Sequence, residues 1–178
     1  MRLHPLLKNR IEDIDRVVLE CHSHTIRMIS VEGPLPNFAA RDHCLQYVVA
    51  VALIDGDITT ESYEDAHAAD PRIDALRKKM VVKENKHFTD DYEARHGNGN
   101  AIQVFFRDGA KTPRIAIEFS VGDPRRRSEG VPLLEKKFRG NLARRYAKKQ
   151  FDAVYALMTD QKKLEATPVN EFMDLLAG

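Results

Sequence analysis

The stretch 101-AIQVFFRDGAKTPRIAIEFSV-121 decides the fold that this sequence predicts. Both of its halves alternate apolar and polar residues, which is the pattern of a strand with one buried face. The apolar positions are Ile102, Val104 and Phe106 in the first half and Ile115, Ile117 and Phe119 in the second. Between the halves, Asp108-Gly109-Ala110-Lys111 is typical of a hairpin turn. The stretch therefore predicts two antiparallel strands, at residues 101–107 and 114–121.

Two further strands are predicted upstream of this hairpin. Residues 14–21, IDRVVLEC, are rich in β-branched side chains, and residues 80–86 have a similar character. Residues 23–31 fit neither the strand period nor the helix period, so they either extend the first strand or form a short helix. Residues 88–100 are polar and contain Gly97-Asn98-Gly99-Asn100, which favours a mobile loop.

The remaining segments have helical signals. Asn37 is expected to cap a helix that runs to about Ile54 and ends at Gly56, and Thr59 to start a short one. Asp70 and Pro71 mark the start of a helix that presents Ile73, Leu76 and Met80. After Gly122-Asp123-Pro124 the chain is predicted to be helical, at residues 132–145, 148–160 and 168–177.

These elements predict an α+β fold. We expect a small antiparallel or mixed sheet of about four strands with helices on one face, followed by a helical C-terminal tail. The predicted domains are residues 1–122, the α+β part, and residues 123–178, the helices. Within the first, residues 1–13 are interpreted as the remnant of a preceding helix.

Composition restricts the class of protein. The chain has 178 residues and a formal net charge of +1, which argues against nucleic-acid or membrane binding through bulk charge. No apolar run reaches about 18 residues, so no transmembrane helix is expected. Residues 1–16 are too polar for a secretory signal, and the two cysteines need not pair. A cytoplasmic protein is the simplest interpretation.

The most informative candidate site lies in 39-AARDHCLQYVVAVALIDGD-57. On one continuous helix, His43 and Tyr47 would be four residues apart and would point the same way. Arg41 and the free N–H groups of the first turn would make this end electropositive, which suits a carboxylate. The alternative is an ordinary capped core helix with a polar rim, and spacing alone leaves both open.

A second candidate is the triplet Arg125, Arg126 and Arg127. Arginines in a turn can bind a carboxylate or a phosphate in a bidentate way. The alternative is a solvated charge run that pairs with Asp123 and Glu129. The basic residues between 136 and 145 are interleaved with Phe138 and Leu142 at helical spacing, so they do not indicate nucleic-acid binding.

Cys21-His22-Ser23-His24 invites a metal interpretation because of its Cys-x-x-His spacing. A zinc site needs a second pair of ligands in a defined frame. The pair His43-Cys44 lies in a predicted buried helix and is a poor second donor pair. We therefore expect no metal here, and no Cys-His nucleophile, because no third orienting group is placed by the sequence.

Five blocks of this sequence, in the same order, resemble the PrpD branch of the MmgE/PrpD family. They are RDHCLQYVVAVALIDGDITTESYED, DPRIDALRKKM, GDPRRRSEG, LLEKKFRGNLARR and LEATPVNEFMDLL. The likeness runs from about Ile14 to Leu176 and covers the C-terminal part of the family's chains. It implies an enzyme with a large helical domain first, a smaller α+β lid second, and final helices that pack on the helical domain.

The resemblance also implies a reaction and a site. Enzymes of this branch are hydro-lyases that dehydrate 2-methylcitrate to 2-methyl-cis-aconitate in propionate breakdown, without an iron–sulfur cluster or other cofactor. The substrate, a tricarboxylate, lies between lid and helical domain. A tyrosine at the place of Tyr47 faces that cleft, so Tyr47 and His43 are the catalytic candidates. Arg41 and the arginines 125–127 are the candidates for substrate binding.

The chain is shorter than the family's enzymes, so it is interpreted as a fragment that is inactive alone. Its expected partners are the substrate, the absent helical domain and a second copy in a homodimer. The tail's apolar stripe is expected to self-associate or to fold back on the sheet; its residues are Phe138, Leu142, Phe151, Val154, Leu157 and Phe172. The alternatives are the lid of a related decarboxylase or epimerase of another polycarboxylate, and a non-enzymatic partner-binding module.

Overall fold

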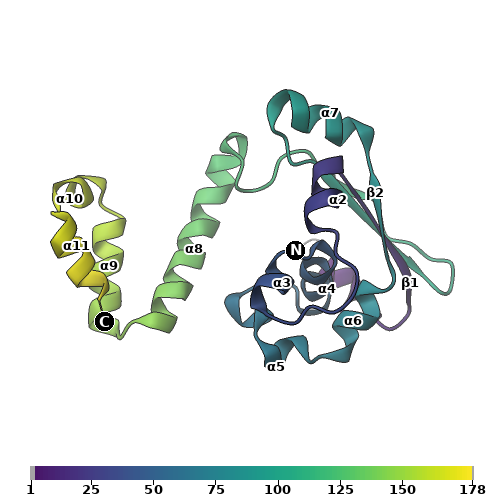
Figure 1. Cartoon of the computed structure of the whole chain (residues 1–178), viewed down its shortest axis with the longest axis horizontal. Helices are drawn as coiled ribbons and strands as arrows, with labels where there is room; N and C mark the ends of the chain where they lie inside the picture. The colour runs from purple at the N-terminus through teal and green to yellow at the C-terminus, as the bar shows by residue number, and fades with distance from the viewer. Residues whose placement is uncertain (1–2, 178) are drawn as a thin grey trace. The chain divides into compact units, whose positions relative to one another are not determined.

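The computed structural model describes residues 3–177, which form two units divided after Ser120 (Figure 1). Met1, Arg2 and Gly178, which belong to the predicted terminal segments, lie outside the described residues. The first unit holds a sheet of four strands: β1 (Ile14–Cys21), β2 (Met80–Glu84), β3 (Asn100–Phe106) and β4 (Ile115–Ile117), in the order β2-β1-β3-β4. β1 is parallel to β2 and antiparallel to β3, and β3 is antiparallel to β4. The predicted α+β class with a mixed sheet is confirmed.

The predicted hairpin is present, with a shorter second strand than expected. Ile102 pairs with Ile115, and the turn is closed by a 2.8 Å hydrogen bond from the Phe106 N–H to the Ala110 carbonyl. Gly109 has φ of 84°, a left-handed conformation that glycine adopts without strain. β4 ends at Ile117 because its partner there, Asn100, is the first residue of β3. Residues 118–121, predicted as strand, therefore have no ladder to join.

β1 lies inside the sheet, and its buried face has an irregular spacing. Ile14 and Val17 are both fully buried, although strict alternation would put residues three apart on opposite faces. A register shift in the pairing with β3 lies between Ile14 and Arg16. Such a bulge adds one residue and returns Val17 to the face that Ile14 occupies.

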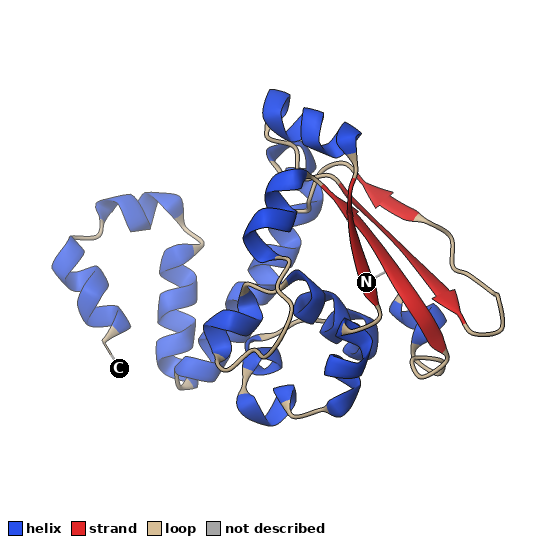
Figure 2. Ribbon diagram, turned by 45° about the vertical axis from the view of Figure 1, so that its right-hand side comes forward, coloured by secondary structure: helices blue, strands red, loops and turns tan. Residues whose placement is uncertain are grey.

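The connection from β1 to β2 is a helical crossover, as a parallel pair requires. Its elements are α2 (Ser23–Ile29), α3 (Phe38–Asp42), α4 (Leu45–Asp55), the 3-10 helix η1 (Thr60–Tyr63), α5 (Asp65–Ala68) and α6 (Pro71–Arg77). α4 and α6, with α1 (His4–Leu7), form one hydrophobic core with β1 and β3 (Figure 2). The fully buried side chains of this core include Leu7, Ile14, Val17, Val51, Ile73, Leu76 and Val104.

Several expected helix boundaries are confirmed. Asn37 caps α3 by accepting a 2.9 Å hydrogen bond from the Ala40 N–H, and Asp70 caps α6 in the same way through Arg72. Gly56 ends α4 in a left-handed conformation, with φ of 82°. The ambiguous stretch 23–31 is helical as α2.

The prediction of one helix from Asn37 to Ile54 is wrong. The chain breaks at His43 and Cys44, and Cys44 has an extended backbone with φ of −117° and ψ of 109°. Cys44 is fully buried, and its thiol lies 3.5 Å from the Val31 carbonyl. This burial of the thiol is a tertiary contact, and hydrophobic periodicity along the sequence cannot predict it.

The prediction of a mobile loop at residues 88–100 is also wrong for most of its length. α7 spans Lys86–Arg95, with Asn85 as its cap, and it buries Phe88. The sequence pattern did not predict this helix because Phe88 is its one buried hydrophobic residue and the rest of the segment is largely polar. Gly99 allows the following strand to pass close to this helix, because a Cβ at Gly99 would lie 2.4 Å from the Phe88 ring.

The second unit is helical, as expected, with different boundaries. It contains the 3-10 helix η2 (Pro124–Arg126), α8 (Arg127–Arg145), α9 (Lys148–Met158), α10 (Gln161–Ala166) and α11 (Val169–Leu176). α8 begins five residues before the predicted start at Pro132, and α10 was not predicted. Leu142 and Val154 of the apolar stripe are buried between the helices. None of the helices among residues 3–177 has the length and apolarity to cross a membrane.

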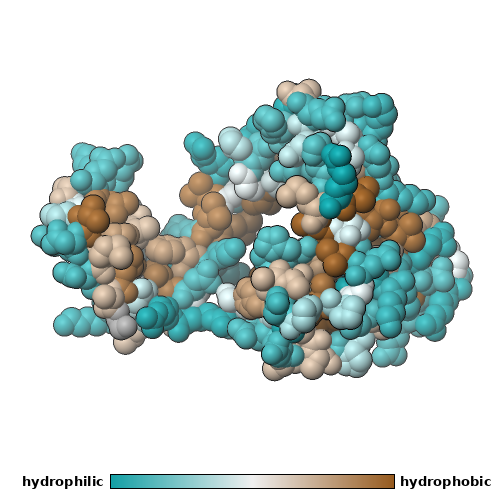
Figure 3. All heavy atoms as spheres, viewed as in Figure 1, coloured by the Kyte–Doolittle hydropathy of each residue, from teal (hydrophilic) through white to brown (hydrophobic). Residues whose placement is uncertain are grey.

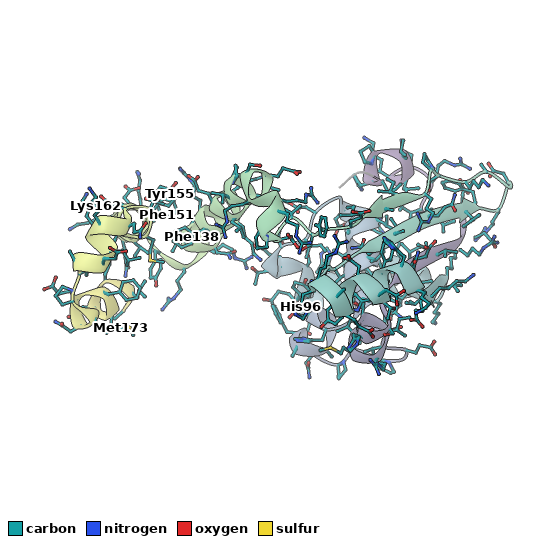
Figure 4. The ribbon with its side chains drawn as sticks, turned by 90° about the horizontal axis from the view of Figure 1, so that it is seen from above. His96, Phe138, Phe151, Tyr155, Lys162 and Met173 are labelled. Atoms are coloured by element: carbon teal, nitrogen blue, oxygen red, sulfur yellow. The ribbon has the colours of Figure 1, made fainter. Side chains whose placement is uncertain are left out.

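Aromatic rings join α8 to α9 in this unit (Figure 4). The Tyr155 ring is stacked on Phe151 at 6.0 Å and on Phe138 at 6.1 Å between centroids. Hydrophobic residues also remain on the surface over α8 and α9 (Figure 3). The exposed ones in this unit are Val131, Leu133, Leu134, Met158, Val169 and Met173.

The inward face of β1 should dominate the stability of the first unit. Val17→Ala removes two buried methyl groups and leaves a cavity, which should lower the free energy of unfolding by about 2 kcal/mol. Val81→Ala is the matched control, since Val81 lies on the neighbouring strand and is 42% exposed. Urea unfolding of both variants checks this. Equal losses would show that β1 does not contribute the core face described above.

Glu20 on β1 should make stability fall in acid. Hydrogen bonds from Arg114 at 2.6 and 2.9 Å, and one from Asn85, hold the pKa of Glu20 at about 2, below its ordinary 4.5. A carboxyl group with a depressed folded-state pKa stabilises the fold above its unfolded pKa. This contribution should be lost as pH falls from about 4.5 towards 2.

The measurement is the free energy of unfolding across that pH range. Glu20→Gln should flatten the slope, because glutamine does not titrate. Glu118→Gln removes an exposed carboxylate just after β4 and should leave the slope unchanged. A wild-type slope that survives in Glu20→Gln would contradict this assignment.

Candidate functional site

A cavity of about 210 Å³ lies among the helices of the first unit. It is lined by Leu35, Arg41, Tyr47, Asp65, Ala68, Ala69, Asp74 and Arg77. Two residues that the sequence singled out, Arg41 from α3 and Tyr47 from α4, thus share one cavity. They reach it from two separate helices, because the chain breaks between α3 and α4.

Arg41 is buried, with 8% of its side chain exposed. Its Nη1 donates to the Tyr63 carbonyl at 2.7 Å and lies 2.7 Å from a carboxylate oxygen of Asp65. The guanidinium therefore joins α3 to the segment that leads into α5. A guanidinium in this position is a suitable donor to a carboxylate, although Asp65 already neutralises part of its charge.

Tyr47 is 2% exposed, and its hydroxyl donates a 2.6 Å hydrogen bond to the Ser62 carbonyl. Burial raises the pKa of the phenol, and the nearby Arg41 charge opposes that shift. The hydroxyl is therefore protonated at neutral pH. It can donate a hydrogen bond to a ligand in the cavity only by giving up the Ser62 carbonyl.

His43 does not line this cavity. It ends α3 with 73% of its side chain exposed, and its Nδ1 lies 3.1 Å from the Ala39 carbonyl. The expectation that His43 and Tyr47 lie on one face of one helix is wrong because the helix breaks between them. An exposed imidazole remains accessible to a ligand that approaches from outside.

The sequence did not single out Asp74 and Arg77 on α6. Both line the cavity of Arg41 and Tyr47, and both also line a second cavity of about 560 Å³. The second cavity is completed by Val31, Glu32, Gly33, Pro34, Gln46, Lys78 and Met80. The available signal was the spacing of three between Asp74 and Arg77, which puts an acid beside a base on one helix.

Arg125, Arg126 and Arg127 lie in the second unit, where η2 meets α8. Arg125 Nε is 3.6 Å from Asp123, and Arg126 Nη2 is 2.7 Å from Glu129. The sequence analysis named these two pairings as the alternative to ligand binding, in which the arginines form a solvated run of charges. Their part in substrate binding stays a prediction.

The stretch from Cys21 to His24 has structural contacts. Burial raises the pKa of the Cys21 thiol to about 11, so it is a poor metal ligand or nucleophile at neutral pH. The His22 ring is stacked on Tyr92 at 4.2 Å, and burial lowers its pKa. Within residues 3–177, no group of three or more His, Cys, Asp and Glu side chains is arranged to hold a metal ion.

A family model and individual relatives both match most of this chain. The family model described as the MmgE/PrpD C-terminal domain matches residues 1–161. A 2-methylcitrate dehydratase from Cupriavidus necator is 45% identical over 99% of this chain and 38% of its own length. Those from Salmonella typhimurium and, in mitochondria, Yarrowia lipolytica are 44% and 37% identical, over 92% and 98% of this chain. This chain spans about a third of the length of these curated relatives.

The buried hydroxyl of Tyr47 should contribute measurably to stability. Tyr47→Phe keeps the ring and leaves the Ser62 carbonyl without its donor, which should lower the free energy of unfolding by about 1 kcal/mol. Tyr47→Ala also removes the ring and should cost about 3–5 kcal/mol. Denaturant unfolding separates the two. A Tyr47→Phe variant as stable as the wild type would show that the hydroxyl is not held by Ser62 in solution.

Proposed function

We propose that this chain, which belongs to the MmgE/PrpD family, is the C-terminal lid part of a hydro-lyase. The whole enzyme dehydrates 2-methylcitrate to 2-methyl-cis-aconitate in propionate breakdown, in the cytoplasm. The observation that carries the proposal is the 42–45% identity to five bacterial 2-methylcitrate dehydratases over nearly the entire chain. Because the chain matches about a third of each relative, we assign the rest of the site to the residues that precede the match in those enzymes.

The reaction needs a base that takes a C–H proton and an acid that helps the hydroxide to leave. The cavity of Arg41 and Tyr47 offers two carboxylates, Asp65 and Asp74, and each is bound to an arginine at 2.6–2.7 Å. Each of these carboxylates is thus already engaged by a guanidinium. The lid therefore contributes binding and hydrogen bonds, and the base belongs to the helical domain.

Within this division, Arg41 binds a substrate carboxylate and Tyr47 donates a hydrogen bond or relays a proton. His43, exposed at the end of α3, meets the substrate from outside the cavity. Arg125, Arg126 and Arg127 are weaker candidates for binding a second carboxylate. No cofactor is needed for these roles, because guanidinium groups and a phenol supply all the donors.

The partner of the second unit is the helical domain. Its exposed apolar residues on α8 and α11, which include Leu133, Leu134 and Val169, are suited to burial against another protein surface. A homodimer is the alternative use of this surface. The alternative function is a binding module without enzymatic activity. A measurement of catalytic turnover distinguishes this module from the lid of an enzyme.

A chimera tests the proposal. The C-terminal 38% of the Cupriavidus necator relative is replaced by this chain, and dehydration of 2-methylcitrate is followed through the absorbance of the new double bond. The chimera should turn over and the isolated chain should not, because the base is absent from it. A folded but inactive chimera, or an active isolated chain, would refute the proposed division.

Tyr47→Phe in the chimera tests the role of the phenol. Loss of a proton-transferring group typically slows a reaction by about 10²-fold or more, and kcat should fall by that order. The matched control is Tyr63→Phe, whose ring lies 6.2 Å from Tyr47 and does not line the cavity. Equal activities of the two folded variants would assign Tyr47 to packing alone.

A further inference from the structure

Arg77 lines both cavities described above and has 10% of its side chain exposed. Its Nη1 donates to Asp74 at 2.6 Å. Its Nη2 donates to the Gly33 carbonyl at 2.9 Å and to the Cys44 sulfur at 3.8 Å. Its Nε is buried and has no hydrogen-bond partner among the described residues. Buried polar groups in folded proteins are nearly always paired, so an unpaired N–H of a buried cation needs an explanation.

The unpaired Nε lies on the edge of the guanidinium that can bind a carboxylate. Nε–H and Nη2–H point the same way, and this edge is the one on which arginine binds both oxygens of a carboxylate. The present acceptors of Nη2 are neutral: the Gly33 carbonyl, in the exposed segment that lines the larger cavity, and the Cys44 sulfur. A carboxylate is a stronger acceptor than a carbonyl, so it can displace Gly33 and fill Nε in one step.

We infer that Arg77 is a further substrate-binding residue, whose Nε and Nη2 take one carboxylate of the polycarboxylate. This assignment rests on the proposed function and adds a residue to it. The cavities are lined by balanced charges: Arg77 and Lys78 face Glu32 and Asp74 in the larger one. The site therefore holds a single carboxylate, and the substrate's other carboxylates are bound elsewhere.

NMR spectroscopy of the ¹⁵N-labelled chain tests this directly, since the Nε–H of a buried arginine gives its own signal. The signal is assigned through the Arg77 side-chain spin system and is followed during titration with citrate and 2-methylcitrate. We expect it to shift saturably, together with the amide signals of Val31–Gly33. Sodium chloride at equal ionic strength should leave it in place.

Two variants make the test specific. Arg77→Lys keeps the charge and loses the two-donor edge, so binding should weaken about tenfold or more. Arg72→Lys is the matched control, because Arg72 lies on the same helix with 53% of its side chain exposed and is bound to Asp70. It should bind as the wild type does. The wild-type signal keeps the test decisive if Arg77→Lys does not fold.

Three outcomes would overturn the inference: an Arg77 signal that does not move, a shift that chloride reproduces, or equal binding by Arg77→Lys and the wild type. The first would mean that an ordered water satisfies Nε. If any of these outcomes is found with an active chimera, the role of Arg77 is refuted and the proposed function is not. An inactive chimera with an intact citrate response at Arg77 would instead refute the assigned reaction.

Discussion

The fold of the first unit depends on the burial of α4, a helix that is apolar around most of its circumference. Gln46, Tyr47, Ala50, Val51, Leu53 and Ile54 are all buried on it. Such a helix cannot lie on a surface and must be covered on several sides. The inward face of the sheet and the helices α1 and α6 provide that cover in one continuous core. The crossover between the parallel strands β1 and β2 is long because it has to build this cover.

This constraint also explains the position of the polar side chains. Tyr47 and Arg41 are enclosed together with α4, and each is satisfied by a backbone carbonyl, of Ser62 and of Tyr63. These two carbonyls are adjacent in η1, so one short helix secures both residues. Buried polar groups that are paired in this way rigidify a site and define its geometry. The same contacts compete with any ligand, so occupancy of the cavity requires an acceptor stronger than a carbonyl.

Local patterns predicted the parts of this structure that local forces determine. Apolar residues at the alternate positions Ile102, Val104 and Phe106 predicted β3. The cap residues Asp70 and Gly56 predicted the start of α6 and the end of α4. The break at Cys44 and the helix α7 were missed because each depends on a contact distant in sequence, of Cys44 with Val31 and of Phe88 with Gly99. For the site, the sequence signalled Arg41 through its place in the first turn of a predicted helix, and Tyr47 through its spacing from His43 and the family resemblance. Arg77 carried no such signal, because the role proposed for it arises from a cavity that forms only when α6 packs near the segment of Gly33.

The charges of the smaller cavity limit what this part of the chain can do alone. Arg41 and Arg77 face Asp65 and Asp74, so the wall carries no net charge. A tricarboxylate brought into a partly desolvated space needs compensating cations, since burying an unpaired charge is costly. One carboxylate can exchange with a carbonyl on a guanidinium edge, and the other two cannot be accommodated by these four residues. The function proposed above therefore requires the remaining positive charge to come from another surface, in agreement with the proposed division of the site between this chain and a second domain.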